Sequence, residues 1–534
     1  MDFGAPSFIF AKLIGVPALF TVLLTILVSP ILVWLYRRRL GAWMGQPAGL
    51  SRGGTETAPT EASHPVIIEE LEPRPTGGRT PAEGTLVAYA AAQIRRAARA
   101  YGIAGLAPAG ILTVVFAIRH QAVISSASLA AALAVFSMPA VMTVLHMLTS
   151  SGWRRLGGMA ALMLFLVITA GDARALAIDV FNLHMLLPAG LFLLFSLRFW
   201  RGVAPMTMLV LAAGSVGWVG LAQVGGWIFA GEGLPVWLLR LLGFAAGTWI
   251  GLKLLGEVAR RYDQRRFSDQ ALFLDAWWLL YTLIQTVVYL MTGGPAYSAV
   301  LLAFPVYWMV KRALLTPPAA PPPASAHRLL LLRVFGFDRR TENFFDALNL
   351  RWRTVGAVEL IAGRDLALRQ IAPADFLAFL SGRLASRFVR DPSAAAITDS
   401  VERPDPDGRF RVRQFLCHAD TWRPVMRSLA ARSDVVVMDL RGFTSEREGC
   451  RYELQTLARL SPGKPIFLIA DRETDIRTVA ESLGAGASTH ARGGERSSRW
   501  TLVRPLRGRD AGRQVFERVA ERLRPQAPPT QGAD

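Results

Sequence analysis

The sequence predicts a chain in two parts: an α-helical multi-pass membrane bundle, followed by a cytoplasmic α/β domain with a doubly wound parallel sheet. Hydrophobic residues make up 52% of the 534 residues and charged residues 19%, against roughly 25% charged in a typical soluble domain. The apolar excess lies almost entirely before residue 316, and strand-like segments alternate with amphipathic ones after residue 327. A proline-rich segment at 316–326, TPPAAPPPASA, separates the two patterns and is typical of an extended spacer.

Hydrophobic runs long enough to cross a bilayer recur through the first part of the chain. The first run, 8–36, is followed at once by three arginines, so residues 1–36 are expected to form a first membrane span and not a cleaved signal peptide. Residues 101–315 are expected to form a polytopic membrane domain. Its apolar runs lie at 101–118, 127–148, 157–171, 178–197, 205–230, 234–255, 271–291 and 296–310. The sequence therefore predicts about nine spans.

Arginine and lysine are distributed unequally between the loops that connect these runs. The alternate loops carry only two arginines between them, Arg119 and Arg174. The other loops carry clusters, at 37–39, 154–155, 198–201, 260–266 and 311–312. Since cytoplasmic loops carry the excess of positive charge, we expect the N-terminus outside and the C-terminal domain in the cytoplasm. The high content of Ala, Arg and Gly favours a bacterial inner (plasma) membrane, with the lipid bilayer as a partner.

Two segments are expected to lack a packed structure. Residues 37–100 contain long stretches of Gly, Pro, Ser and Thr and are predicted to form a disordered cytoplasmic loop. Residues 526–534 are predicted to form a disordered tail. Within the loop, the stretch 87–100 is compatible with two structures. It is either a basic amphipathic helix on the membrane surface or the beginning of the second span.

Ionisable residues inside membrane spans are typical of transporters. Arg240, Lys253 and Asp275 fall near span ends, where snorkelling toward the interface explains them. His184 lies further inside its span, and a packed histidine is favoured there over a proton relay. Transport therefore stays an alternative function of the membrane part.

Residues 327–525 show strands alternating with amphipathic helices, which predicts a parallel sheet covered on both faces. The expected strands are 328–335, 357–361, 410–416, 434–440, 465–470 and 500–504. The expected helices lie near 342–353, 373–388, 420–432, 447–460, 474–484 and 510–523. Residues 390–409 are expected to form an exposed insertion.

Composition and missing motifs exclude several classes of function. The net charge of +19 is explained by arginines that flank membrane spans, so we expect no nucleic-acid partner. Cys417 and Cys450 lack a CxxC spacing, which favours buried free thiols and no metal site. The sequence has no GxxxxGK[ST] loop, no GxGxxG after the first strand and no GxSxG elbow. Phosphate-loop ATPases and serine hydrolases therefore have little support, and no cofactor is expected with certainty.

One carboxylate stands out in the stretch 434–454, DVVVMDLRGFTSEREGCRYEL. Ser445 and Glu448 have the spacing of a capping box, so a helix is expected to begin there. Glu453 falls at the edge of the apolar stripe of this helix and is expected to be half-buried. A buried carboxylate is either paired or functional. The candidate pairing partners are Arg441, Arg447 and Arg451.

Doubly wound sheets bind ligands at the carboxyl ends of their strands. In this sequence that edge includes GFDRR at 336–340, GRD at 363–365 and DLRG at 439–442. Asp439 and Arg441 are therefore candidate nucleotide-binding residues.

The passage 428–454, SLAARSDVVVMDLRGFTSEREGCRYEL, resembles the middle of a Toll/interleukin-1 receptor (TIR) domain. In that family an SD-V-V-V strand leads into a loop and then into a helix with a Cys-x-x-Glu-Leu box, here Cys450, Glu453 and Leu454. The resemblance implies a TIR/flavodoxin-like fold. It also implies that Glu453 is the catalytic residue for cleaving NAD, as substrate, between nicotinamide and ribose. The opening RVFGFDRR resembles the first strand and turn of the family, where four residues would line the nucleotide pocket: Gly336, Phe337, Asp338 and Arg339.

Three functions stay open on the sequence alone. The first is a membrane protein that senses a membrane signal through a TIR-like signalling or nucleotide-binding domain, which self-associates. The second is a membrane-tethered NAD hydrolase that uses Glu453. The third is a transporter or channel with a regulatory cytoplasmic domain.

Overall fold

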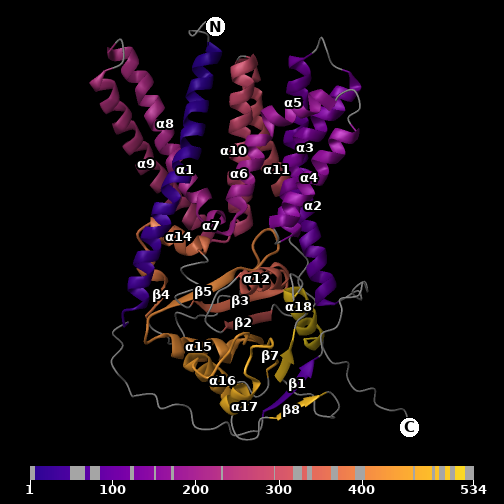
Figure 1. Cartoon of the computed structure of the whole chain (residues 1–534). Helices are drawn as coiled ribbons and strands as arrows, with labels where there is room; N and C mark the ends of the chain where they lie inside the picture. Colours follow the sequence, from indigo (N-terminus) through magenta and orange to yellow (C-terminus); the bar gives the residue numbers. More distant parts are fainter. Residues whose placement is uncertain are drawn as a thin grey trace.

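The computed structural model of the chain has two parts stacked along one axis (Figure 1). Long helices form the upper part, and an α/β domain lies below them. The start of the first helix lies at the end of the molecule that is far from the α/β domain. The structure describes residues 6–47, 66–71, 85–120, 125–149, 152–169, 174–229, 233–293, 295–316, 327–333, 339–362, 371–390, 403–460, 464–483, 488–491, 500–504 and 511–523.

Among the described residues, seven helices are long and apolar enough to cross a membrane. The first part consists of α1 (Pro6–Met44), α2 (Leu86–Arg119), α3 (Ser126–Leu148), α4 (Gly152–Thr169), α5 (Arg174–His184), α6 (Leu186–Ser196), α7 (Arg198–Arg201), α8 (Ala204–Phe229), α9 (Leu234–Asp263), α10 (Asp269–Gly293), the 3-10 helix η2 (Pro295–Leu302) and α11 (Ala303–Leu315). The predicted count of nine differs because the run 178–197 is interrupted at Met185 between α5 and α6. The run 157–171 lies in α4, which is not among the seven. With these two runs removed, the number of spans falls from nine to seven and is still odd.

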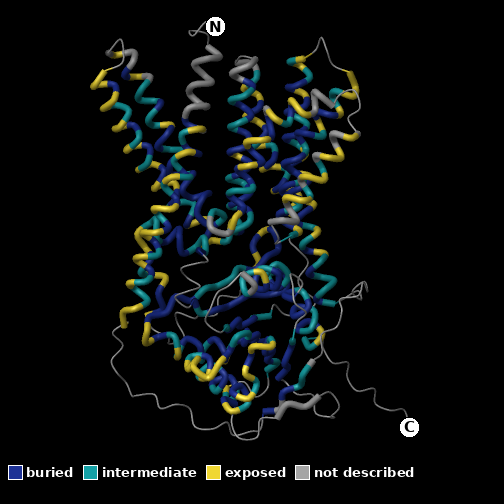
Figure 2. The backbone as a smooth tube through the Cα atoms, viewed as in Figure 1, coloured by how far each residue is buried: buried dark blue, intermediate teal, exposed yellow. Residues whose placement is uncertain are grey.

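Glycines bring α8 and α9 into close contact. A Cβ atom on Gly217 would lie 2.0 Å from the carbonyl oxygen of Gly243, and one on Gly247 would lie 2.2 Å from that of Ala213. Small residues let helix backbones approach where lipid offers no hydrophobic drive for association. The opposite surface of α9 carries exposed large apolar side chains, among them Leu238 and Trp249. In Figure 2 the outer helices of the upper part show exposed positions along their lengths. That surface has the composition of a lipid-facing one.

The α/β domain is built on one nine-stranded sheet in which every strand pair is parallel. Its strands are β1 (Ile67–Leu71), β2 (His327–Arg333), β3 (Gly356–Ala362), β4 (Phe388–Val389), β5 (Val412–Cys417), β6 (Val435–Asp439), β7 (Ile466–Ile469), β8 (Ser488–Ala491) and β9 (Trp500–Val503). The six strands predicted from the sequence are all present, and β1, β4 and β8 are additional. Its spatial order is β4-β5-β3-β2-β6-β7-β9-β1-β8.

The strand order reverses its direction between β2 and β6. The six predicted strands have the order 3-2-1-4-5-6, which is the dinucleotide-binding order of doubly wound sheets. If the unit of β5 and its following helix is set aside, the remaining five strands have the flavodoxin-like order 2-1-3-4-5. In both descriptions the crevice for a ligand lies at the carboxyl ends of β2 and β6.

Helices cover both faces of the sheet, as the continuous apolar run of β2 requires. Leu329 and Leu331 pack toward α12 (Arg339–Trp352) and α18 (Ala511–Arg522), on the face nearer the membrane helices (Figure 1). Leu330 and Leu332 pack toward the helices of the opposite face. Those helices are α15 (Trp422–Arg432), α16 (Glu448–Leu460) and α17 (Ile476–Leu483). All six predicted helices of this domain are confirmed, with the segment 373–388 divided into α14 (Pro373–Leu380), the 3-10 helix η3 (Leu384–Arg387) and β4.

The predicted disordered loop 37–100 contains regular structure, so that prediction is wrong for its described residues. Helix α1 continues to Met44, and β1 pairs with β9 on one side and β8 on the other. The stretch 87–100 is the beginning of one continuous helix with the second span, which confirms the second of the two alternatives. Its first turns contact the α/β domain, because Leu86 and Ala90 are buried in the cluster around α12 and α18. The structure does not describe 48–65 or 72–84.

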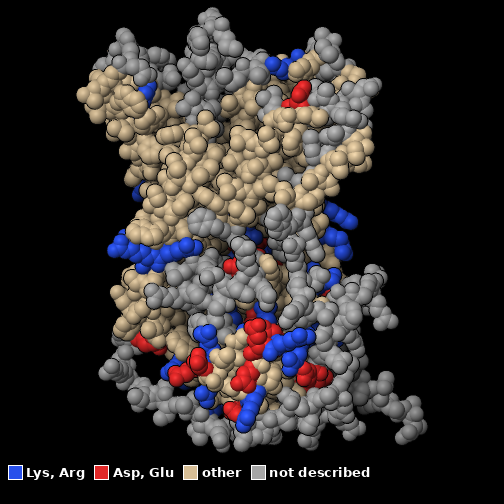
Figure 3. Space-filling model, viewed as in Figure 1, with Lys and Arg blue, Asp and Glu red and all other residues tan. Residues whose placement is uncertain are grey.

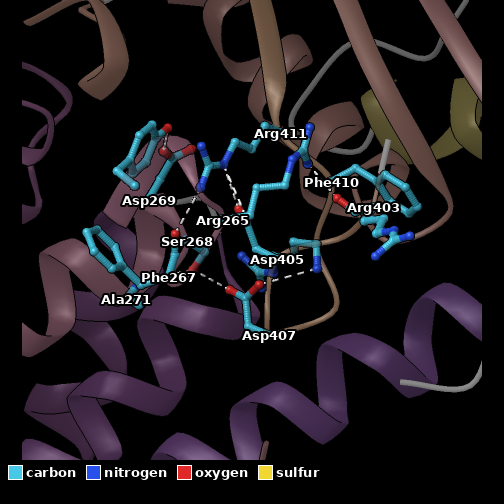
Figure 4. Close-up of polar contacts among 12 residues, drawn as sticks. Arg265, Phe267, Ser268, Asp269, Ala271, Arg403, Asp405, Asp407, Phe410 and Arg411 are labelled. Atoms are coloured by element: carbon cyan, nitrogen blue, oxygen red, sulfur yellow. Dashed lines mark hydrogen bonds and ion pairs between the residues drawn. The ribbon is translucent and has the colours of Figure 1, made fainter. Parts of the chain in front are cut away.

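Several further contacts between described residues join the α/β domain to the membrane helices, and two of them lie on different sides of the domain. On one side, Tyr36 of α1 packs edge-on against Phe376 and Phe379 of α14. On the other, the segment 403–411 lies against the junction of α9 and α10 (Figure 4), where Ser268 donates a hydrogen bond to Asp407 at 2.7 Å. The described part of the predicted exposed insertion 390–409 is thus partly buried, and the tail 526–534 lies outside the described residues.

Candidate functional site

A cavity of about 340 Å³ opens at the carboxyl ends of three neighbouring strands, β2, β3 and β5. Helices α12 and α16 supply parts of its wall. Met44 and Gly45, at the end of α1, supply another part. The cavity therefore lies at the edge where doubly wound sheets bind ligands, and a membrane helix reaches it directly.

Glu453 contributes a carboxyl group to this cavity. Helix α16 begins at Glu448, three residues later than the predicted capping box. Its apolar face buries Cys450, Leu454 and Leu457 against the sheet. Glu453 is half-buried at the edge of that face, as predicted. Its Oε2 atom is shielded from solvent and, within the described structure, has no hydrogen-bond partner.

Burial raises the pKa of Glu453 to about 8, and the guanidinium of Arg333 opposes this rise. The carboxyl group is therefore mostly protonated at neutral pH. Arg441 is not its partner, because Arg441 donates to both oxygens of Asp439 at 2.8 and 2.7 Å. Arg447 and Arg451 are exposed, and among the described residues no ion pair joins either of them to Glu453. The alternative that Glu453 is a structural ion pair with one of these three arginines has no support in the structure.

His418 supplies a second polar atom to the same cavity. Its Nδ1 atom lies 3.1 Å from the carbonyl oxygen of Trp43 and 3.2 Å from that of Gln46. Both partners are acceptors, so Nδ1 carries a proton and the neutral ring has its lone pair on Nε2. Nε2 is buried and lacks a hydrogen-bond partner among the described residues. His418 is thus positioned to accept a hydrogen bond from an occupant of the cavity.

The remaining lining is mainly apolar, with one further polar group. Trp422 and Phe345 present aromatic surfaces, and the Oδ1 atom of Asn349 is buried without a described partner. Cys417 also lines the cavity, but burial raises the pKa of its thiol to about 12, so it is not a nucleophile at neutral pH. Both cysteines are buried free thiols, as predicted. Among the described residues, no group of three or more His, Cys, Asp or Glu could hold a metal ion.

The cavity chemistry suits a small molecule with flat apolar surfaces and a few hydrogen-bonding groups. A protonated carboxyl group donates one hydrogen bond, while the imidazole nitrogen and the amide oxygen accept. Buried polar atoms without partners are costly in a folded protein. A ligand that forms hydrogen bonds with Glu453, His418 and Asn349 would remove the free-energy penalty of their unpaired polar atoms.

The predicted nucleotide-binding residues fall into two groups. Gly336, Phe337 and Asp338 lie outside the described residues, and Arg339 begins α12 with its side chain not described. Asp439 and Arg441 lie at the predicted strand edge. They bind each other there, and the Arg441 guanidinium lies 4.8 Å from the ring centroid of Phe344. Neither of the two lines the cavity.

The ionisable side chains of the membrane part have partners. His184 Nδ1 lies 2.7 Å from Gln285 Oε1, which agrees with the packed histidine expected from the sequence. Arg240 and Lys253 lie over the rings of neighbouring tryptophans. Snorkelling is wrong for Asp275, because Lys311 donates to it at 2.5 Å and Lys311 is buried.

Sequence reasoning did not find His418 or Asn349. The position of His418 just after a predicted strand is the one signal that could have marked it. Comparison with protein-family models, curated proteins and solved structures finds no match for this chain.

Proposed function

We propose that this chain is a membrane sensor whose α/β domain binds a small nucleotide-class ligand and transmits its presence through α1. The observation that carries the proposal is the cavity wall, which includes Met44 and Gly45 from the end of α1. An occupant would touch the membrane helix itself. A conformational change requires a ligand that interacts differently with two states. A cavity lined by both the α/β domain and the end of α1 lets one ligand contact both parts.

Three features support a nucleotide-class ligand. The cavity lies at the carboxyl ends of the parallel strands β2, β3 and β5, next to the reversal point between β2 and β6. Trp422 and Phe345 can stack against a base. Glu453, His418 and Asn349 offer the polar contacts that fix its orientation. A TIR-like signalling role, including self-association through the α/β domain, is compatible with this site.

The proposed location is the inner membrane of a bacterium, with the α/β domain in the cytoplasm. Lysine and arginine gather at the level where the apolar surface meets the α/β domain (Figure 3). Arg260 and Arg261 at the end of α9 are exposed there, as is Arg38 on α1. Positive charge at that level supports a cytoplasmic position for this side and an external position for the start of α1.

Hydrolysis of NAD by Glu453 is a second candidate, because this carboxyl group faces a cavity without a described hydrogen-bond partner on Oε2. In that reaction water adds to the ribose carbon as the bond to nicotinamide breaks, giving nicotinamide, ADP-ribose and a proton. The departing nicotinamide leaves an oxocarbenium-like centre, which an ionised carboxylate stabilises. The cationic nicotinamide ring of bound NAD would favour the ionised form of Glu453. Transport has less support, because the four candidate residues of the spans, His184, Arg240, Lys253 and Asp275, are paired or stacked.

The test is ligand binding by the full-length protein in detergent. Calorimetric titration with adenosine, ADP-ribose and NAD is compared between the wild type, Glu453→Gln and Glu448→Gln. Glu448 is exposed on the same helix and serves as the matched control. We expect binding by the wild type and the control, and at least tenfold weaker binding by Glu453→Gln. Absence of binding for all three compounds would contradict the nucleotide-class proposal.

Release of nicotinamide, followed by chromatography, separates the two candidates. Turnover by the wild type and the Glu448→Gln control that Glu453→Gln abolishes would establish the hydrolase. Binding without turnover would leave the sensor and exclude the hydrolase.

A further inference from the structure

A second cavity, of about 160 Å³, lies where the α/β domain meets the cytoplasmic ends of the membrane helices. The ends of α3, α7 and α9 and the start of α10 form its membrane side. The C-terminal half of α12 and the start of α14 form its other side. Of the residues predicted from the sequence to bind a nucleotide, the two with described side chains, Asp439 and Arg441, do not line it. It is a different site from the cavity that holds Glu453, although Asn349 of α12 contributes to both.

Arg409 enters this cavity from the segment 403–411. A tight turn presents it: Gly408 has φ 81°, and the backbone NH of Asp405 donates to the carbonyl of Arg409 at 2.8 Å. Arg409 is only 5% exposed. Its Nε and one Nη atom have neither solvent access nor a hydrogen-bond partner among the described residues. The turn thus holds two N–H donors in a closed space.

Three further guanidinium groups line the cavity: those of Arg201, Arg353 and Arg387. Two of them are paired, Arg353 with Asp269 at 3.2 Å and Arg387 with Asp375 at 2.8 Å. The Nε2 amide of Gln270 adds a donor that is buried without a described partner. Four guanidiniums therefore face three carboxylates, of which Asp346 is the third.

The electrostatic surroundings do not compensate Arg409 fully. Burial lowers its pKa, the Asp407 carboxylate opposes this effect, and the Arg353 guanidinium adds to it. Asp407 itself accepts a hydrogen bond from Ser268, and its second oxygen accepts from the backbone of Arg409 at 3.3 Å. An arginine that stays charged in a closed space needs acceptors for its N–H groups.

We propose that this cavity binds the phosphate group of a phosphomonoester, with Arg409 as its bidentate donor and Gln270 and Arg201 as further contacts. A guanidinium fork matches the spacing of two phosphate oxygens, and charge-assisted hydrogen bonds of this kind are the strongest in proteins. The cavity is large enough for a phosphate group, and it is smaller than the roughly 300–1,000 Å³ of typical small-molecule sites. Because it lies at the ends of the membrane helices, the phosphate belongs either to an anionic lipid or to a soluble molecule.

The experiment follows the unfolding temperature of the full-length protein in detergent as inorganic phosphate is titrated at constant ionic strength against chloride. We expect a saturable rise for the wild type. For Arg409→Gln the half-saturating concentration should increase at least tenfold, and Arg409→Lys should lie between the two because it keeps the charge and loses the fork. Arg411→Gln is the matched control, since Arg411 lies in the same segment but binds Asp405 and does not line this cavity.

Nanodiscs separate the two sources of phosphate. One preparation contains phosphatidylcholine alone and the other adds phosphatidic acid. A rise caused by phosphatidic acid in the wild type but not in Arg409→Gln assigns a lipid ligand, and a rise with inorganic phosphate alone assigns a soluble one. If Arg409→Gln does not fold, Arg201→Gln replaces it as the cavity variant. An equal response of the wild type and the cavity variant, or no response to either probe, would overturn the proposal.

Discussion

His418, at the end of β5, and Trp43, at the end of α1, are joined across 375 residues of sequence by a hydrogen bond of 3.1 Å from Nδ1 to the carbonyl oxygen. The Trp43 ring also packs at 5.9 Å from Phe388 and 6.2 Å from His418, measured between centroids. A backbone carbonyl at a helix end is an acceptor that the helix itself leaves unsatisfied. The histidine therefore both fixes the end of the membrane helix and lines the cavity beside it.

Replacing Trp43 by alanine should weaken ligand binding without altering any side chain that lines the cavity. The end of α1 would lose its aromatic contacts, and with them the position of Met44 and Gly45. We expect about tenfold lower affinity, which corresponds to ~1.4 kcal/mol, for the ligand identified by calorimetry. Trp34→Ala is the control, because Trp34 is 57% exposed on the same helix. Equal affinities of the two variants would refute a positioning role for Trp43.

Replacing Glu453 by glutamine should make the stability of the protein less dependent on pH. The folded-state pKa of about 8 exceeds the ordinary value of 4.5 for a glutamate. The contribution of the protonated form is therefore fully present below pH 4.5 and is lost as pH rises through 8. Well above pH 8 the wild type should be less stable than the variant by roughly 5 kcal/mol, which is the free-energy equivalent of the difference between the two pKa values. Unfolding temperatures measured between pH 5 and 9 test this, and the exposed Glu448→Gln should follow the wild type.

A single methyl group on Gly247 should disturb the membrane part. The added Cβ would meet the carbonyl oxygen of Ala213 at 2.2 Å, so α8 and α9 would have to separate. We expect Gly247→Ala to lower the unfolding temperature by several degrees. Gly256→Ala on the same helix meets no atom within 4 Å. It should leave the temperature unchanged or raise it slightly, because alanine favours the helix by roughly 0.5–1 kcal/mol over glycine. A matching loss in both variants would argue against tight glycine packing.

The six predicted strands could be found from the sequence because each is a short apolar run bounded by turn residues. The three that were missed carry weak local signals. β4 has two residues and β8 four, and β1 reads Ile-Ile-Glu-Glu-Leu inside a polar loop. The acids of β1 are neutralised by Arg522 and Arg504, more than 430 residues away. Local periodicity contains no information about such partners.

The residues of the candidate sites also divide into one that the sequence could locate and others that it could not. Glu453 could be placed at the edge of an apolar helix face from spacing alone, and its half-burial is confirmed. The role of His418 depends on the backbone carbonyl groups of Trp43 and Gln46, at and just after the end of α1. The role of Arg409 depends on the ends of the membrane helices that line its cavity. These relationships arise only when the membrane part and the α/β domain are docked on each other. The sequence does not indicate how the two parts contact each other, so it does not indicate the roles of His418 and Arg409.

The position of β1 has a consequence for how this chain is made. Its strand leaves the ribosome before six of the seven long apolar helices, yet its neighbours β8 and β9 come near the end of synthesis. The strand stays unpaired while the helices enter the membrane, and it then pairs between two strands that are synthesised late. A chain that stops before residue 488 leaves β1 without both neighbours, and a fragment that starts at 327 leaves β8 and β9 without their bridge. A truncated or excised chain therefore leaves a strand edge unpaired. Unpaired strand edges promote aggregation and are recognised by quality-control proteases.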